Sequence, residues 1–217
     1  QQGYNVFTLS FSGHGQTPFA TNFGIEQFSL ELEQFINENK LNQPTVFGYS
    51  MGGYVALAFA ELYPDSVKGI FLQNSTSRAD SDERKTNRDR AIAAVKENYA
   101  TFVRMSIANL FSEDNRERLD NEIEKVKLEA LKTPLQGIVA ALEGMKIRKD
   151  REVILHFASY PILLILGKKD PVLQYEKSLD QIKNTRVGLV SFEDGHMSHI
   201  ENKNELIQSL KLFFQTL

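Results

Sequence analysis

Short β-rich runs alternate with helical runs along most of this chain, and this alternation restricts the fold more than any other feature of the sequence. The expected strands are residues 6–11, 45–49, 67–72, 162–166 and 187–192, and helical patterns cover residues 25–36, 51–63, 173–182 and 205–214. Two strands joined through a helix normally run parallel in one sheet. The sequence therefore predicts an α/β architecture with a mostly parallel sheet and helices on both of its faces.

The alternation breaks once, in the middle of the chain. Residues 76–158 contain helical patterns and many charges of both signs but no convincing strand. We expect them to form an inserted set of helices, while residues 1–75 and 159–217 form the core that contains the sheet. With 217 residues, 41% of them hydrophobic, the chain should bury about 70% of its extended surface without disulfides or metals.

Composition excludes several kinds of function. There is no cysteine, which removes thiol nucleophiles and thiolate metal sites and permits a cytoplasmic location. The net charge of −3 provides no basic excess for nucleic acid or an anionic membrane. The longest apolar run, residues 162–166, is far shorter than the roughly 20 residues of a membrane helix. Apart from a small-molecule ligand, the expected partner is at most a second copy of the chain in a homodimer.

A nucleophile-elbow pattern lies where the second expected strand meets the next helix. Residues 48–52 read GYSMG, which matches the G-x-S-x-G motif, and Gly53 extends it. A sharp turn from strand to helix strains the serine backbone and exposes the hydroxyl above the sheet, while glycines avoid collisions within the turn. The start of the helix directs backbone N–H groups at an oxyanion. The pattern therefore predicts that Ser50 is a nucleophile.

A serine hydroxyl needs a neighbouring base, and the chain has four histidines. His196 follows the last expected strand, so it lies at the sheet edge where catalytic groups of open α/β sheets gather. Its rival is His199, which is more readily interpreted as an exposed residue near the terminal helix. His14, between two glycines, is interpreted as a loop or pocket-lining residue, and His156 as a surface residue.

The acid that orients the base should follow a strand and precede the histidine. Asp170 lies in the segment GKKDP directly after the fourth expected strand, 26 residues before His196. One helix and one strand separate the two residues, so adjacent loops bring them together. Asp194 is the weaker alternative, because it is so close to His196 in sequence that it cannot easily reach round to the ring.

Together these features resemble the α/β-hydrolase fold superfamily, particularly small bacterial esterases, enol-lactonases and related hydrolases with a helical cap. The matching segments are residues 12–15 (SGHG), the elbow, the turn that contains Asp170, and the segment from Gly195 to Glu201. The resemblance implies that Ser50 is the nucleophile, Asp170 the acid and His196 the base, and that residues 76–158 cap the pocket. It implies neither a metal nor an organic cofactor.

The resemblance also implies a strand that is not in this sequence. In the family, a strand that ends in a His-Gly loop lies upstream of the segment that opens this chain and supplies one of two oxyanion N–H groups. Its place in the family's sheet is between the strands expected at residues 6–11 and 45–49. The chain begins without a methionine and leads straight into a strand, so we expect upstream sequence to be missing. The N–H of Met51 would be the remaining oxyanion donor.

Three functions are compatible with this fold and these three candidate residues. The first is hydrolysis of a carboxylic ester, thioester or lactone through an acyl-enzyme on Ser50. The second is carbon–carbon bond hydrolysis or acyl transfer with the same three residues, and the third is a non-catalytic small-molecule receptor. Apolar side chains of the expected cap offer a substrate lining, although simple core packing is the better explanation for most of them: Tyr99, Phe102, Met105, Leu110, Phe111 and Met145. Cap arginines would suit a substrate with a carboxylate: Arg78, Arg84, Arg88, Arg90, Arg104 and Arg148.

Overall fold

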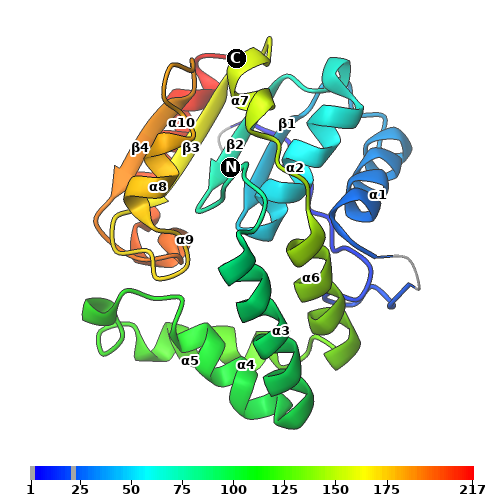
Figure 1. The fold of residues 1–217 in the computed structure, drawn as a ribbon. Helices are drawn as coiled ribbons and strands as arrows, with labels where there is room; N and C mark the ends of the chain where they lie inside the picture. The colour runs from blue at the N-terminus through cyan, green and yellow to red at the C-terminus, as the bar shows by residue number, and fades with distance from the viewer. Residues whose placement is uncertain (1–2, 21–22) are drawn as a thin grey trace.

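A four-stranded parallel sheet lies at the centre of the molecule (Figure 1). The computed structural model describes residues 3–20 and 23–217. The strands are β1 (Thr45–Tyr49), β2 (Gly69–Gln73), β3 (Ile162–Gly167) and β4 (Gly188–Phe192), and they lie side by side in chain order. All three neighbouring pairs run parallel, so the carboxyl ends of the strands lie along one edge of the sheet.

Ten α-helices occur within the described residues. Those that flank the strands in sequence are α1 (Ile25–Glu38), α2 (Met51–Leu62), α8 (Tyr175–Asp180), α9 (Ser198–Glu201) and α10 (Lys203–Phe214). Between β2 and β3 lie α3 (Asp82–Glu97), α4 (Tyr99–Ala108), α5 (Asp120–Ala130), α6 (Leu135–Ile147) and α7 (Glu152–Phe157). Single turns of 3-10 helix follow α2 at Pro64–Ser66 and α4 at Glu113–Asn115. Helices and strands thus alternate as predicted, and the four strands begin and end within two residues of the expected limits.

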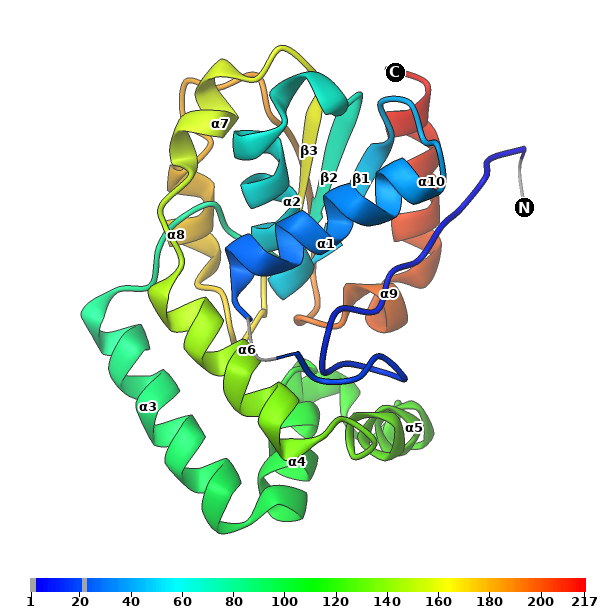
Figure 2. The ribbon, with the colours of Figure 1, turned by 90° about the vertical axis from the view of Figure 1, so that its right-hand side faces the viewer.

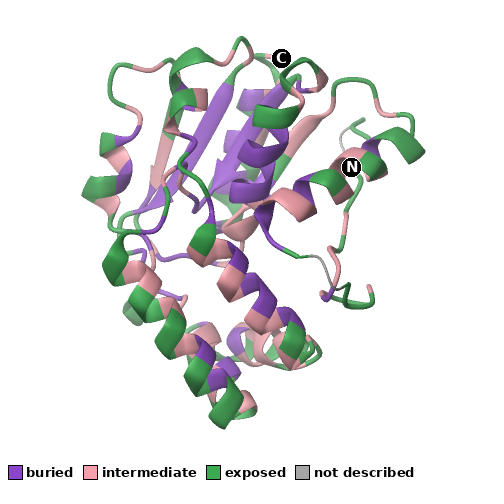
Figure 3. Ribbon diagram, turned by 45° about the vertical axis from the view of Figure 1, so that its right-hand side comes forward, coloured by how far each residue is buried: buried purple, intermediate pink, exposed green. Residues whose placement is uncertain are grey.

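The two faces of the sheet are covered by different helices, because successive side chains of a strand point to opposite faces. Leu72 and Leu164 belong to a core cluster that includes side chains of α2 and α7, with α8 packed against it. Phe71 and Ile165, one residue away in each strand, pack with α10. Figure 3 shows the resulting buried centre, in which β2 and β3 are buried along their whole lengths.

Helix α2 is the innermost helix of the molecule. Eight of its twelve residues are buried, in keeping with its sequence MGGYVALAFAEL, which is apolar on nearly all sides. The helix ends at Leu62, two residues before Pro64, because the residue before a proline disfavours helical backbone. This buried helix provides a rigid support for the turn that precedes it.

The prediction of a strand at residues 6–11 is wrong. This segment is irregular, and it pairs with no strand among the described residues. It is held instead by aromatic contacts: Tyr4 stacks on Phe214 with ring centroids 4.5 Å apart, and Phe11 stacks on Phe28 at 4.9 Å. A β-rich sequence forms a strand only where a neighbouring strand accepts its backbone hydrogen bonds. Figure 2 shows the segment running outside the sheet.

Helices α3 to α6 extend from one end of the sheet as a separate group (Figures 1 and 2). Helix α7, which falls within the range 76–158 expected for the cap, lies elsewhere: Leu155 is part of the main core cluster beside α2. None of the helices in the described part of the chain is long and apolar enough to cross a membrane.

Candidate active site

Ser50 occupies the turn between β1 and α2, at the carboxyl edge of the sheet. Its backbone angles, φ 50° and ψ −115°, lie in a region that residues other than glycine rarely adopt. Two contacts hold this conformation. The Ser50 N–H donates to the carbonyl of Gln73 (2.9 Å), and the Ser75 hydroxyl donates to the Ser50 carbonyl (2.8 Å). The turn is therefore attached to the end of β2 and exposes the Ser50 hydroxyl at the sheet edge.

The glycines of the turn have different roles. A Cβ on Gly48 would lie 2.5 Å from the Gly52 carbonyl oxygen, and one on Gly53 would collide with the Ser75 side chain. At Gly52, the second glycine of the motif, a Cβ would meet no atom within 4 Å. The close packing of the elbow thus depends on Gly48 and Gly53, whereas the sequence motif identifies Gly48 and Gly52.

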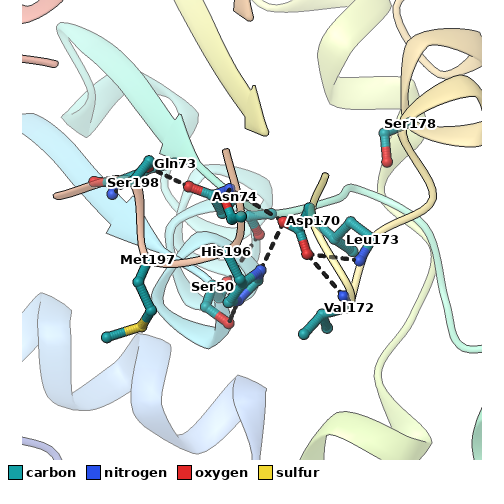
Figure 4. A network of polar contacts seen from close by, with 12 residues as sticks. Ser50, Gln73, Asn74, Asp170, Val172, Leu173, Ser178, His196, Met197 and Ser198 are labelled. Atoms are coloured by element: carbon teal, nitrogen blue, oxygen red, sulfur yellow. Dashed lines mark hydrogen bonds and ion pairs between the residues drawn. The ribbon is translucent and has the colours of Figure 1, made fainter. Parts of the chain in front are cut away.

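The structure brings Ser50, His196 and Asp170 into one hydrogen-bonded line (Figure 4). His196 Nδ1 lies 2.8 Å from Asp170 Oδ2, and His196 Nε2 lies 2.9 Å from Ser50 Oγ. An ionised carboxylate can only accept a hydrogen bond, so the Nδ1–H donates to Asp170. Nε2 then carries no proton and accepts from the Ser50 hydroxyl. This arrangement can remove the proton of Ser50 as the oxygen attacks a substrate.

Three further donors surround the Asp170 carboxylate. Oδ1 accepts from the backbone N–H groups of Val172 (2.8 Å) and Leu173 (3.0 Å), and Oδ2 accepts from Asn74 Nδ2 (3.1 Å) as well as from His196. Burial alone would raise the pKa of Asp170, but the hydrogen bonds and the charge of His196 outweigh it and lower the pKa below its ordinary value. Asp170 is thus an ionised carboxylate at neutral pH.

The rival residues occupy different positions. His199 is not exposed as expected: its ring packs edge-on against Tyr49, with centroids 4.8 Å apart, and burial lowers its pKa. Asp194 accepts from Asn202 Nδ2 at 2.8 Å and does not contact the His196 ring. His14 contacts the face of Phe28, and His156 is exposed on α7.

Three buried polar residues near the site were not anticipated from the sequence. Gln73 ends β2 and Asn74 follows it directly; Asn74 is completely buried with φ 46°. Glu201, at the end of α9, accepts from the backbone N–H groups of Ser112 (2.8 Å) and Met197 (3.1 Å). A signal for the first two was present in the sequence: polar residues follow an apolar strand directly, at the edge where the other candidate residues lie.

The expected lining residues separate into three groups. Met145 packs against the cluster of α1 and α2 that Met51 also joins, beside the elbow. Phe111 is completely buried in a cluster with Met197 that Tyr49 borders. The Tyr99 hydroxyl, with its single proton, lies within hydrogen-bond distance of two carbonyls that follow α5. Phe102 is half-buried, and Met105 is 60% exposed.

Five of the six cap arginines considered as carboxylate ligands pair with the protein's own acids. Arg84, Arg88 and Arg148 surround the buried Asp80, at distances of 3.0, 2.9 and 2.7 Å. Arg78 pairs with Glu152. Arg104 makes a looser surface pair with Glu124, and Arg90 donates to Asn87. Within the described residues, no group of three or more histidines and carboxylates could hold a metal ion.

Known proteins resemble this chain along most of its length. An esterase from Thermogutta terrifontis, solved with malate bound, is 28% identical, with a TM-score of 0.82 over 94% of this chain and 76% of that one. The enol-lactonase of Burkholderia xenovorans LB400 has a TM-score of 0.84 over 94% of this chain and 78% of that one, at 21% identity, which supports the fold alone. Pimeloyl-[acyl-carrier protein] methyl ester esterase of Neisseria meningitidis is 26% identical over 77% of this chain, which spans only 54% of that protein.

The family model of the alpha/beta hydrolase fold matches residues 1–203. This match covers the elbow, the Asp170 turn and the His196 loop. It agrees with the parallel sheet and with the placement of all three residues at its carboxyl edge. The chain belongs to the α/β-hydrolase fold family.

Proposed function

We propose that this protein is a serine hydrolase that cleaves a carboxylic ester, thioester or lactone through an acyl-enzyme on Ser50. The observation that carries the proposal is the unbroken hydrogen-bonded line from Ser50 Oγ through both ring nitrogens of His196 to Asp170. A non-catalytic receptor would have no need for a serine whose backbone is held in a strained conformation at φ 50°.

The reaction follows from the positions of the protons. Ser50 Oγ attacks the carbonyl carbon while His196 Nε2 takes its proton, and Asp170 stabilises the imidazolium that forms. His196 then donates this proton to the leaving oxygen or sulfur, and the acyl group remains on Ser50. A water molecule then gives a proton to Nε2 as its oxygen attacks the acyl carbon. When this second tetrahedral intermediate collapses, Nε2 returns the proton to Ser50 Oγ, which restores the enzyme and releases the acid.

The oxyanion of the tetrahedral intermediate needs N–H donors. Met51 is the first residue of α2, and the first N–H groups of a helix have no partner within the helix. We assign its backbone N–H to the oxyanion, and we place Met51, Met145 and Phe111 around the acyl group of the substrate. Removal of one oxyanion donor costs about 100- to 1,000-fold in turnover in other enzymes.

The names of two relatives favour an ester as the substrate. The Thermogutta terrifontis protein is an esterase, and the Neisseria meningitidis protein is a methyl ester esterase. The cap arginines bound to acidic partners leave little support for a carboxylate-binding pocket built from Arg84, Arg88 or Arg148. We therefore expect uncharged acyl groups to be the better substrates.

A fluorophosphonate probe combined with short-chain p-nitrophenyl esters tests the proposal. The wild-type protein should be labelled on Ser50 and should release p-nitrophenol, and Ser50→Ala should lose both. His196→Gln and Asp170→Asn should lower kcat by about 10⁴-fold or more, as such changes do in other serine hydrolases.

Ser106→Ala, on α4 outside the elbow, is the matched control and should keep the wild-type rate. Labelling of another residue, or equal ester turnover by Ser50→Ala, would refute the acyl-enzyme on Ser50.

A further inference from the structure

A series of hydrogen-bonded, buried side chains continues from Asp170 Oδ2, the oxygen that also accepts from His196. Asn74 Nδ2 donates to Asp170 Oδ2 (3.1 Å) and to the carbonyl of Gly195 (3.2 Å). Asn74 Oδ1 accepts from the Ser198 hydroxyl, and the Ser198 oxygen accepts from Gln73 Nε2 at 2.8 Å. Figure 4 shows Asn74 between Ser198 and Asp170. All of these side chains are at most 9% exposed.

Only one placement of the protons satisfies every donor and acceptor in this series of hydrogen bonds. The Asp170 carboxylate and the Gly195 carbonyl can only accept, so Asn74 must present its NH₂ group to them. Its oxygen therefore faces Ser198, whose single proton must point to it. The Ser198 oxygen then needs a donor, which Gln73 supplies. Asp170 and Gly195 thus fix which way the Asn74 amide faces, and Ser198 with Gln73 holds its oxygen in that orientation.

Asn74 also connects the two loops that must meet at the site. Asp170 lies in the loop after β3, and Gly195 directly precedes His196 in the loop after β4. One NH₂ group holds both loops, so it sets the separation of the carboxylate and the imidazole. Asn74 keeps a backbone φ of 46° in this position, a conformation that asparagine tolerates better than most residues.

We propose that Asn74 is a positioning residue that acts through Asp170 to hold His196 in its working tautomer and place, and that Ser198 orients Asn74 for this task. The inference rests on the proposed hydrolase function for its kinetic consequences, although its geometry does not. Asn74 contacts neither the substrate nor Ser50 in this role. Its contribution is expected in kcat rather than in KM.

The test compares Asn74→Gly with Asn202→Ala. Glycine accepts the positive φ, so the first variant removes the amide without adding backbone strain. Asn202 is a matched control, because it is a buried asparagine that donates at 2.8 Å to a different aspartate, Asp194, in the loop that carries His196. Thermal unfolding of both variants measures the loss of stability that removal of any buried amide would cause.

For Asn74→Gly we expect kcat on p-nitrophenyl acetate to fall about 10- to 100-fold with little change in KM, since displacement by about 1 Å costs about 100-fold. The acid side of its pH–rate profile should move to higher pH, because a hydrogen bond that favours the ionised Asp170 is lost. Ser198→Ala should shift the pH–rate profile in the same direction but by a smaller amount. Asn202→Ala should leave the profile unchanged.

Proton NMR of protein labelled with ¹⁵N-histidine provides a measurement without substrate. The Nδ1–H resonance of His196, assigned by its loss in His196→Gln, should be sharp in the wild type and in Asn202→Ala but broadened or shifted in Asn74→Gly. An unchanged resonance and an unmoved pH profile in Asn74→Gly would overturn the inference, and an unmoved profile in Ser198→Ala would overturn the part assigned to Ser198.

Failure of the proposed function has a different signature. It would appear in the wild-type protein itself, as no label on Ser50 and no ester turnover. The NMR comparison would still decide the role of Asn74 in that case.

Discussion

At the scale of single residues, the site depends on a few backbone conformations that the surrounding structure maintains. Ser50 and Asn74 both have positive φ angles, and both follow directly after a strand. Each is anchored to the neighbouring strand: the N–H of Ser50 donates to Gln73 in β2, and the N–H of Asn74 donates to Ile165 in β3. Hydrogen bonds to the adjacent strands therefore stabilise the two strained turns.

The glycines of the elbow allow a sharp comparison. Gly52→Ala should leave the free energy of unfolding unchanged or raise it by up to about 1 kcal/mol, because its Cβ meets no atom and alanine favours a helix. Gly53→Ala should lower it by about 1–3 kcal/mol, because the methyl group collides with Ser75. Urea unfolding of both variants measures the difference, and equal changes would contradict this account.

The depressed pKa of Asp170 has a consequence for stability. Because this carboxyl has a lower pKa in the folded than in the unfolded state, its ionisation stabilises the fold above its ordinary pKa of about 4. This contribution is lost as the pH falls through the folded pKa. The stability advantage of the wild type over Asp170→Asn should therefore shrink below about pH 4. Urea unfolding between pH 7 and 3 measures it, and a constant difference would argue against an ionised Asp170.

At the scale of elements, Glu201 joins the end of α9 to the segment between α4 and α5. Its carboxylate accepts from Ser112 N and Met197 N, and from Asn115 Nδ2 at 3.0 Å. The N–H of His196 donates to the carbonyl of Leu110 at 2.9 Å, in the same segment. The inserted helices are thus fastened to the loop that carries His196.

Loss of this carboxylate should release the segment. Glu201→Ala leaves buried N–H donors without partners, and each costs on the order of 1–3 kcal/mol. We expect faster amide hydrogen exchange at Ser112 and Met197 and a lower melting temperature. Glu205→Ala, exposed on α10, is the control and should change neither. Unchanged exchange in Glu201→Ala would mean that the carboxylate does not hold the two elements together.

At the scale of the whole molecule, the insertion is attached to the core by buried charges at both of its ends. Asp80 precedes α3, and Arg148 follows α6, so the 2.7 Å pair between them closes the insertion at its base. The Arg148 guanidinium also lies 4.1 Å from the centre of the Tyr54 ring of α2. Arg151 extends the attachment to Glu26 and Glu61, in α1 and α2.

Removal of Asp80 should therefore destabilise the protein strongly. Asp80→Ala leaves Arg148, whose side chain is only 2% exposed, without its carboxylate, and such a change costs about 3–5 kcal/mol. Arg84→Ala removes the most exposed of the three arginines and should cost less than about 1 kcal/mol. Chemical denaturation compares the two, and similar losses would refute a special role for the buried pair.

Local sequence patterns were sufficient to predict those elements whose burial or ends follow from their own residues. An apolar run such as residues 162–166 must be buried wherever it lies, and a proline such as Pro64 ends a helix in any context. The order of a serine, an acid and a histidine after three strands likewise places all three at one edge, because parallel strands share the edge at which they end.

Other features depended on contacts between distant parts of the chain. Residues 6–11 have the composition of a strand but lack a partner, and no local pattern reveals whether a neighbouring strand is present. Asn74 meets Asp170 across 96 positions, and Glu201 meets Ser112 across 89. Hydrophobic periodicity and turn chemistry were enough to place the four strands of the sheet, the elbow and the three candidate residues. The hydrogen-bond partners became known only from the folded molecule, because a polar side chain bonds with whichever groups folding buries beside it.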